Sequence, residues 1–228
     1  MQMGDIGANV ARVRARIAEA ALRSGRRPES VVLVGVTKTV GVDRVRDLVA
    51  CGVRECGENR VQEAREKVPE LPDVTWHLIG SLQRNKVKEA LRLFQVIHSV
   101  DSVGLAEELS RRSAEREGAG PVDVLIQVNI SLEPQKHGAP LDGAEHLVAG
   151  VLRLPGVRVR GFMGMAPLVS NPEEARPYFR RLRELRDRVR DALPDAEAGD
   201  LSMGMTDDFE VAIEEGATMV RVGRALFA

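Results

Sequence analysis

The sequence predicts a single (β/α)8 barrel, an α/β fold built on a closed parallel sheet. Short apolar runs of strand length alternate with amphipathic segments of helix length about eight times along the chain. Such alternation is typical of parallel sheets, and about eight repeats favour a closed barrel over an open sheet. The 228 residues, 43% of them hydrophobic, suffice for one such domain, so residues 1–228 are predicted to form a single domain.

The first half of the chain begins with a helix over 10–22, where apolar residues recur at helical spacing until Gly25 and Pro28 end it. Residues 31–36 form a continuous, largely β-branched apolar run, which predicts a strand buried on both faces. The same patterns then predict a helix over 42–49, a short strand near 53–56, a strand over 75–79, a helix over 83–93 and a strand over 94–98.

The second half continues the alternation, and its clearest strand is the apolar run over 122–129. A long, strongly charged segment with apolar residues on one face predicts the helix over 172–193. The remaining predictions are helices over 102–116, 141–152 and 207–215, strands over 157–162 and 218–222, and a short strand or loop at 201.

Composition and charge argue against several classes of protein. The chain carries 33 basic and 34 acidic residues and only 3% aromatic residues, which gives no support for binding nucleic acid. No apolar run has the length of a membrane span or the pattern of a signal peptide. Cys51 and Cys56 are too few for a disulfide framework, and the four histidines show no metal-ligand spacing. We expect a cytoplasmic protein without membrane or nucleic-acid partners, and without a metal.

Polar residues and glycines follow the predicted strands, at ends that meet on one face of a barrel. Lys38 comes directly after the first apolar run, and it is one of five lysines in the chain. Partial desolvation there would favour a neutral amine, which can attack an aldehyde and form an imine. A lysine that extends past the strand end into solvent fits the same spacing equally well.

Two segments near the end of the chain fit a phosphate group. Residues 201–208 form a loop before a helix, where Ser202 and Thr206 offer hydroxyls and helix-start amides bind anions. Capping of that helix by Thr206 or by the next residue is the alternative. In the following loop Gly223 offers another amide, and Arg221 stands in an apolar strand where it needs a partner. Barrels often bind phosphate between their last two loops, which favours this site over a buried salt bridge for Arg221.

An imine-forming lysine and a phosphate site with an arginine between them fit pyridoxal 5′-phosphate (PLP), which carries an aldehyde and a phosphate. Arg221 would face the pyridine nitrogen, and its positive charge would disfavour protonation of that nitrogen. The ring would then be a weaker electron sink, which limits the carbanion chemistry that the cofactor supports. The hypothesis is PLP held as a Schiff base on Lys38.

Seven segments, in this order and spread over nearly the whole chain, resemble the pyridoxal phosphate homeostasis proteins of the YggS/PROSC type. They are VTK (36–38), GENRVQE (57–63), WHLIGSLQRNK (76–86), QVNIS (127–131), GFM (161–163), LSMGMT (201–206) and VRVG (220–223). Each segment alone would be weak, but all of them together are highly specific. The resemblance implies a TIM-type barrel like the N-terminal domain of alanine racemase, without its C-terminal β domain.

The resemblance also implies a role for particular residues. PLP would be attached to Lys38 and its pyridine nitrogen would face Arg221. The phosphate would be held by Ser202, Thr206 and the amides of Gly223 and Arg224, and the pocket would be lined by Asn59, His77 and Met203. The implied function is intracellular PLP homeostasis, with PLP-dependent apoenzymes as expected acceptors and no robust catalytic activity.

Two enzymes are the main alternatives. A PLP-dependent amino-acid racemase needs a second acid–base group on the far side of its substrate, and the one tyrosine, Tyr178, falls in the charged helix. A Schiff-base aldolase without PLP would explain Lys38 alone, and the colour of the purified protein would distinguish it. A carrier is favoured because no second base is evident. A monomer is expected because no residue from a partner is required.

Overall fold

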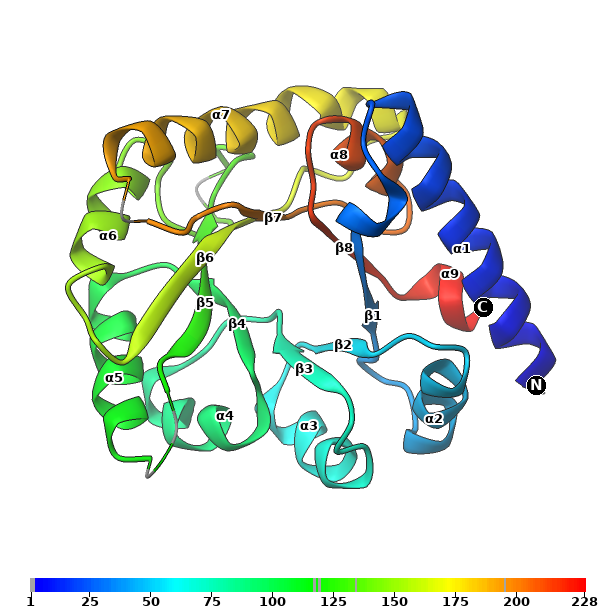
Figure 1. Ribbon diagram of the computed structural model, residues 1–228, viewed down its shortest axis with the longest axis horizontal. Helices are drawn as coiled ribbons and strands as arrows, with labels where there is room; N and C mark the ends of the chain where they lie inside the picture. The colour runs from blue at the N-terminus through cyan, green and yellow to red at the C-terminus, as the bar shows by residue number, and fades with distance from the viewer. Residues whose placement is uncertain (1–2, 117, 119, 134, 195) are drawn as a thin grey trace.

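The structure is a computed structural model that describes residues 3–116, 118, 120–133, 135–194 and 196–228. Within these residues eight parallel strands close into a barrel in sequence order, because β8 pairs with β1. The helices form a ring around the strands (Figure 1). This arrangement confirms the predicted (β/α)8 barrel.

The strands are β1 (Val32–Val36), β2 (Glu55–Glu58), β3 (Thr75–Leu78), β4 (Val96–Val100), β5 (Val122–Val128), β6 (Val157–Gly164), β7 (Asp200–Ser202) and β8 (Met219–Val222). The helices are α1 (Met3–Arg23), α2 (Val42–Ala50), α3 (Val61–Lys67), α4 (Val87–Leu93), α5 (Val103–Ala114), α6 (Ala144–Val151), α7 (Arg176–Ala192), α8 (Phe209–Glu214) and α9 (Arg224–Phe227). Not one of these helices combines the length and the apolar character that crossing a membrane requires.

The core is mainly aliphatic, as the low aromatic content requires, and it fills the layer between the strands and the surrounding helices. Gly35 in β1 shows how closely the layers approach, because a Cβ there would lie 2.7 Å from the side chain of Leu48 in α2. A larger residue at this position would push α2 away from the first strand.

Several predicted boundaries differ from the structure, and α9 was not predicted. Helix α1 begins at Met3 rather than at residue 10. Helix α4 begins at Val87 rather than at residue 83, because 84–86 form a separate 3₁₀ turn. Strand β4 spans 96–100 rather than 94–98, since Phe94 still donates its amide to Ala90 at the end of α4. Helix α8 begins at Phe209 rather than at residue 207. Helix α3 was not predicted at all.

Helix α1 closes the ring by packing against the last helices of the chain, α8 and α9. The side-chain amide of Asn9 donates to the main-chain oxygens of Leu226 at 3.2 Å and of Ala228 at 2.9 Å. Figure 1 accordingly shows the two ends of the chain beside each other.

Candidate functional site

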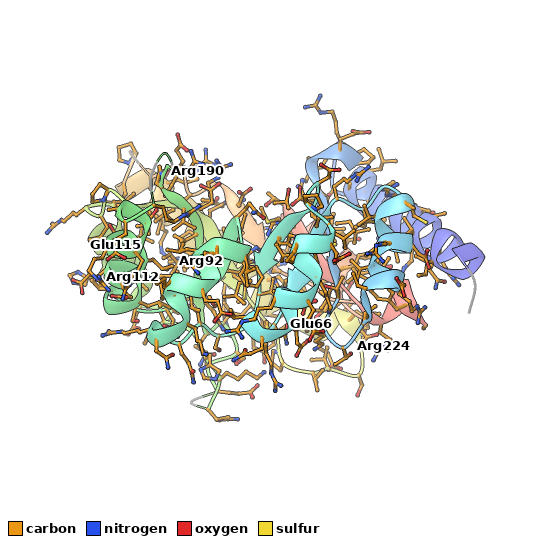
Figure 2. The ribbon with its side chains drawn as sticks, turned by 90° about the horizontal axis from the view of Figure 1, so that it is seen from below. Glu66, Arg92, Arg112, Glu115, Arg190 and Arg224 are labelled. Atoms are coloured by element: carbon orange, nitrogen blue, oxygen red, sulfur yellow. The ribbon has the colours of Figure 1, made fainter. Side chains whose placement is uncertain are left out.

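A cavity of about 720 Å³ opens at the carboxyl ends of the strands. Its lining includes six of the nine predicted site residues, which are Lys38, Asn59, Thr206, Arg221, Gly223 and Arg224. Figure 2 places Arg224, which follows β8, toward one end of the barrel, and Arg190, near the end of α7, toward the other. A second cavity of about 600 Å³, beside Arg190, contains none of the predicted residues. The predicted cluster therefore corresponds to one pocket at the expected face of the barrel.

Lys38 follows β1 at the rim of this cavity. The preceding residue, Thr37, is fully buried, whereas Lys38 is exposed. The expectation of a partly desolvated amine is therefore wrong for the protein by itself, and the lysine extends past the strand end into solvent. An exposed side chain that lines a cavity remains accessible to an aldehyde.

Arg221 is buried in β8, with 4% of its surface exposed, and its guanidinium lines the cavity floor. Its Nη1 donates to Ser202 Oγ at 2.6 Å and its Nη2 donates to the Gly164 oxygen at 3.2 Å. Burial lowers the pKa of Arg221 to about 10, and the nearby Asp208 carboxylate opposes this shift. Among the described residues no carboxylate lies within ion-pair distance of Arg221, so the alternative of a buried salt bridge is not observed.

Ser202, His77 and Met203 are buried and do not line the cavity. The Ser202 hydroxyl accepts a hydrogen bond from Arg221 and contacts His98 Nδ1 at 3.0 Å. Its predicted role in holding a phosphate would require this hydroxyl to leave both partners. His77 lies deeper, bonded to His98 at 2.8 Å. The structure therefore puts these three residues outside the pocket lining, and Ser202 is the one that bonds to Arg221.

The buried polar side chains form a continuous chain through the barrel. It runs from Arg221 through Ser202, His98 and His77 to Glu55, whose Oε2 lies 2.7 Å from His77 Nε2. Arginine can only donate, so Ser202 accepts from Arg221, and its own proton can go to a neutral His98 at Nδ1. In that tautomer His98 Nε2–H donates to His77 Nδ1, and His77 Nε2–H donates to the Glu55 carboxylate. The direction of these bonds follows from the tautomer of His98.

The charge state of His98 agrees with this assignment. Burial, reinforced by the neighbouring His77 and Arg221, holds the pKa of His98 well below its ordinary value. A neutral His98 can accept the Ser202 proton, so Arg221 keeps a hydrogen-bond acceptor that carries no positive charge.

The loops after β7 and β8 form the opposite wall of the cavity from Asn59 and Gly80. Gly204 permits the first loop, because its φ is +89° and a Cβ there would lie 2.6 Å from the Ala212 side chain. The Asp208 carboxylate accepts the Met205 amide at 2.6 Å, so neither Thr206 nor Asp207 caps α8.

Thr206 is consequently available to the cavity that it lines. The Arg224 guanidinium is paired with Asp207 at 2.6 Å, which joins the two loops. The Arg224 amide lies at the start of α9, where a helix leaves its amides without internal partners. A hydroxyl and helix-start amides suit an anion.

Several lining residues had no predicted role. They are Val36, Arg60, Ile79, Gly80, Ser81, Gln127, His137, Met165, Leu168, Met205 and Asp207. Most of them, such as Arg60, Ser81 and Gln127, lie in segments that were quoted for the resemblance, so the signal was present but unused. His137 belongs to the loop after β5, and no spacing in the sequence ties it to Lys38.

The fold and this cavity define a (β/α)8 protein with a primary amine, a buried arginine and helix-start amides in one pocket. The chain belongs to the family described as the alanine racemase N-terminal domain, whose model matches residues 8–228. A relative from Aquifex aeolicus, named "Pyridoxal phosphate homeostasis protein", is 45% identical over 224 residues, which cover 96% of this chain and 95% of the relative.

Two solved structures have the same fold at substantial identity. A protein of unknown function from Bifidobacterium adolescentis has a TM-score of 0.93 and 36% identity, covering 99% of this chain and 95% of that one. PipY of Synechococcus elongatus, solved with PLP bound, has a TM-score of 0.81 and 38% identity, covering 93% of this chain and 100% of that one.

Proposed function

We propose that this protein binds PLP as a Schiff base on Lys38 and takes part in PLP homeostasis. The observation that carries the proposal is the single cavity that brings Lys38 together with Thr206, Arg221 and the start of α9. Residues from the beginning and the end of the chain thereby offer an amine and an anion site to one small molecule. The names of the curated relatives and the PLP-bound PipY structure support the same cofactor.

The chemistry of these side chains fits the groups of PLP. PLP supplies an aldehyde that condenses with a primary amine and a ring that can accept electrons. Lys38 provides the amine, while Thr206 and the amides of Gly223 and Arg224 would hold the phosphate. Arg221 would meet the ring nitrogen with a positive charge, which disfavours protonation of that nitrogen. The pocket is thus suited to hold PLP without activating it strongly.

A carrier explains the site better than a racemase does. Tyr178 lies on α7 and stacks against the Arg181 guanidinium 5.2 Å from its ring centre, and it does not line the cavity. His137 lines the cavity and is exposed, so it is the residue to test as a second base. Alanine racemisation by the PLP-loaded protein that disappears in His137→Ala would favour the enzyme over the carrier.

The attachment point is tested by borohydride reduction in the presence of PLP, followed by peptide mass mapping. We expect the reduced PLP adduct on the peptide that contains Lys38, and no adduct in Lys38→Ala. Lys86→Ala is the matched control, because Lys86 lines the adjoining cavity and not this one. A Lys38 that stays unmodified in excess PLP contradicts the proposal, and a colourless protein that acts on a phosphorylated aldehyde or ketone favours the aldolase.

The remaining parts of the proposal concern the oligomeric state, the acceptors of PLP and the cellular location. We propose a cytoplasmic monomer that delivers PLP to apoenzymes, because the proposed site requires no residue from a partner. Light scattering of the purified protein tests the monomer. Activation of a PLP-dependent apoenzyme by the loaded protein, faster than by its dissociated PLP, tests delivery.

A further inference from the structure

Behind the turn that carries Lys38 lies a buried cluster of three residues, Thr37, Glu58 and Lys67. The Lys67 ammonium, from the last residue of α3, donates to Glu58 Oε1 at 2.6 Å and to the main-chain oxygen of Thr37 at 2.7 Å. Thr37 Oγ1 donates to the same Glu58 oxygen at 2.5 Å. The residue that precedes Lys38 is therefore held by its main chain and its side chain at once.

The turn that follows is one that threonine rarely adopts. The Val40 amide donates to the Thr37 oxygen at 3.0 Å, and Thr39 has a φ of +61°. A positive φ at the third position is typical of a type II turn, where glycine is preferred and a β-branched residue is strained. The Thr39 amide also donates to Glu63 Oε2 at 3.3 Å. Helix α3 thus contacts this strained turn on both sides of Lys38, through Lys67 and Glu63.

Both charges of the cluster are shielded from water. The side chains of Glu58 and Lys67 are 0% and 8% exposed, and Glu58 Oε2 has no hydrogen-bond partner among the described residues. Burial raises the pKa of Glu58, while the hydrogen bonds from Lys67 and Thr37 oppose the shift. A buried ion pair adds little net stability over apolar side chains of similar volume. The cluster is therefore better explained by the main-chain oxygen that it holds.

We propose that Lys67 and Glu58 are positioning residues for Lys38, which fix the Thr37–Lys38 peptide and so direct the Lys38 amine into the cavity. This inference rests on the proposed function. In the step concerned, Lys38 Nζ bonds to the aldehyde carbon of PLP and one water leaves. The cluster exchanges no atoms in that step. Its effect is on the rate at which a correctly placed amine meets the aldehyde.

The test compares the wild type with Lys67→Met/Glu58→Gln, which removes both charges and leaves no unpaired ion. Imine formation is followed by visible absorbance after PLP is added, and borohydride trapping locates the adduct. Binding of pyridoxine 5′-phosphate, which lacks the aldehyde, reports on the pocket independently of the amine. Arg46→Met/Glu70→Gln is the matched control, because it removes an exposed ion pair from the neighbouring surface.

We expect the double variant to bind the aldehyde-free analogue as the wild type does, and to form the imine about ten- to a hundredfold more slowly. Adding Thr39→Gly to it should restore much of the rate, because glycine keeps a positive φ without support from α3. A cluster that serves only the stability of the fold would show no such rescue.

Three results would overturn the inference. They are an unchanged rate in the double variant, a parallel loss of analogue binding and imine formation that Thr39→Gly does not restore, and an adduct on Lys67 in the wild type. A wild type that forms no adduct at all refutes the proposed function as well. A wild type that forms the adduct on Lys38, with a double variant that forms it at the same rate, refutes the positioning role alone.

Discussion

Two buried polar networks lie beside the cavity, and they hold different parts of the protein: one a main-chain segment, the other a side chain. The cluster of Thr37, Glu58 and Lys67 contains an ion pair. Its Lys67 ammonium donates to the main-chain oxygen of Thr37, beside the exposed Lys38. The histidine chain, from Glu55 through His77, His98 and Ser202, holds the side chain of a buried arginine. One network therefore fixes a backbone beside an exposed side chain, whereas the other fixes a buried side chain itself.

The difference follows from what each group would have to do in the proposed function. An amine that captures an aldehyde from solution must be accessible, so only its point of attachment can be rigid. A guanidinium that meets a bound ring must already be in place, and an uncharged acceptor can hold it there. Ser202 is that acceptor, and the low pKa of His98 keeps the imidazole behind it uncharged near neutral pH. The two networks can be distinguished by how each responds to loss of one member.

The largest effect is expected from Lys67→Met alone. The variant leaves the fully buried Glu58 carboxylate without its counter-charge, which costs about 3–5 kcal/mol of the free energy of unfolding. Urea denaturation measures this loss. Adding Glu58→Gln should recover most of it, because the unpaired charge is then gone. If the double variant were as unstable as the single one, apolar packing and not charge would explain the loss.

A smaller loss is expected from His98→Phe, because this network contains no buried ion pair. The change leaves His77 Nδ1 without its partner, at about 1–3 kcal/mol, while the Ser202 hydroxyl keeps its bond from Arg221. Urea denaturation at pH 7 gives the value. His146→Phe, on the outer helix α6, is the control for the change in side chain. If His98→Phe lost more unfolding free energy than Lys67→Met does, the expected order of the two networks would be reversed.

The pH dependence of stability should differ between the wild type and His98→Phe. Because the folded state lowers the pKa of His98, the unfolded chain binds this proton more readily. The contribution of His98 is complete above its unfolded pKa of about 6.5 and is lost as the pH falls toward its folded value. Between pH 6.5 and 5 the wild type should lose up to about 1.4 kcal/mol more per pH unit than the variant. Parallel pH profiles would contradict the neutral assignment.

The smallest effect is expected at the outer end of the histidine chain. The Glu55 side chain is 32% exposed, so water can replace it as the acceptor for His77 Nε2–H. Glu55→Gln should therefore cost less than about 1 kcal/mol of unfolding free energy. The unfolding free energy of Glu58→Gln, measured in the same way, gives the loss for a fully buried carboxylate. If Glu55→Gln and Glu58→Gln lost equal unfolding free energy, the histidine network would depend on the charge of Glu55.

The barrel was predictable from the sequence because strand-length apolar runs such as 31–36 and 122–129 alternate with amphipathic segments. Helix α3 was not predicted because it has only seven residues, of which Val61 and Ala64 alone are apolar. That helix supplies Lys67 and Glu63, which contact the turn that carries Lys38. Without the helix, these contacts could not be predicted either. Short helices are stabilised by tertiary packing more than by their own sequence.

The cavity residues were predictable in part, since Lys38 and Arg221 stand at or near strand ends where barrels place their sites. The histidine chain was not predicted, because the four histidines were examined for metal-ligand spacing alone. Strand pairing aligns His77 with Val96, so His98 lies two residues further along on the same face of the sheet. That register depends on how neighbouring strands align in the closed barrel, which the spacing of residues along the chain does not determine.

The contact of α1 with α8 and α9 has a consequence for how the chain is made. The apolar face of α1 is translated about two hundred residues before the helices that cover it. Throughout elongation the part of this face that contacts α8 and α9 stays uncovered or is shielded by a chaperone, whereas α2 can already pack against α1. The Asn9 amide, likewise, finds its two carbonyl partners only when residues 226 and 228 have left the ribosome.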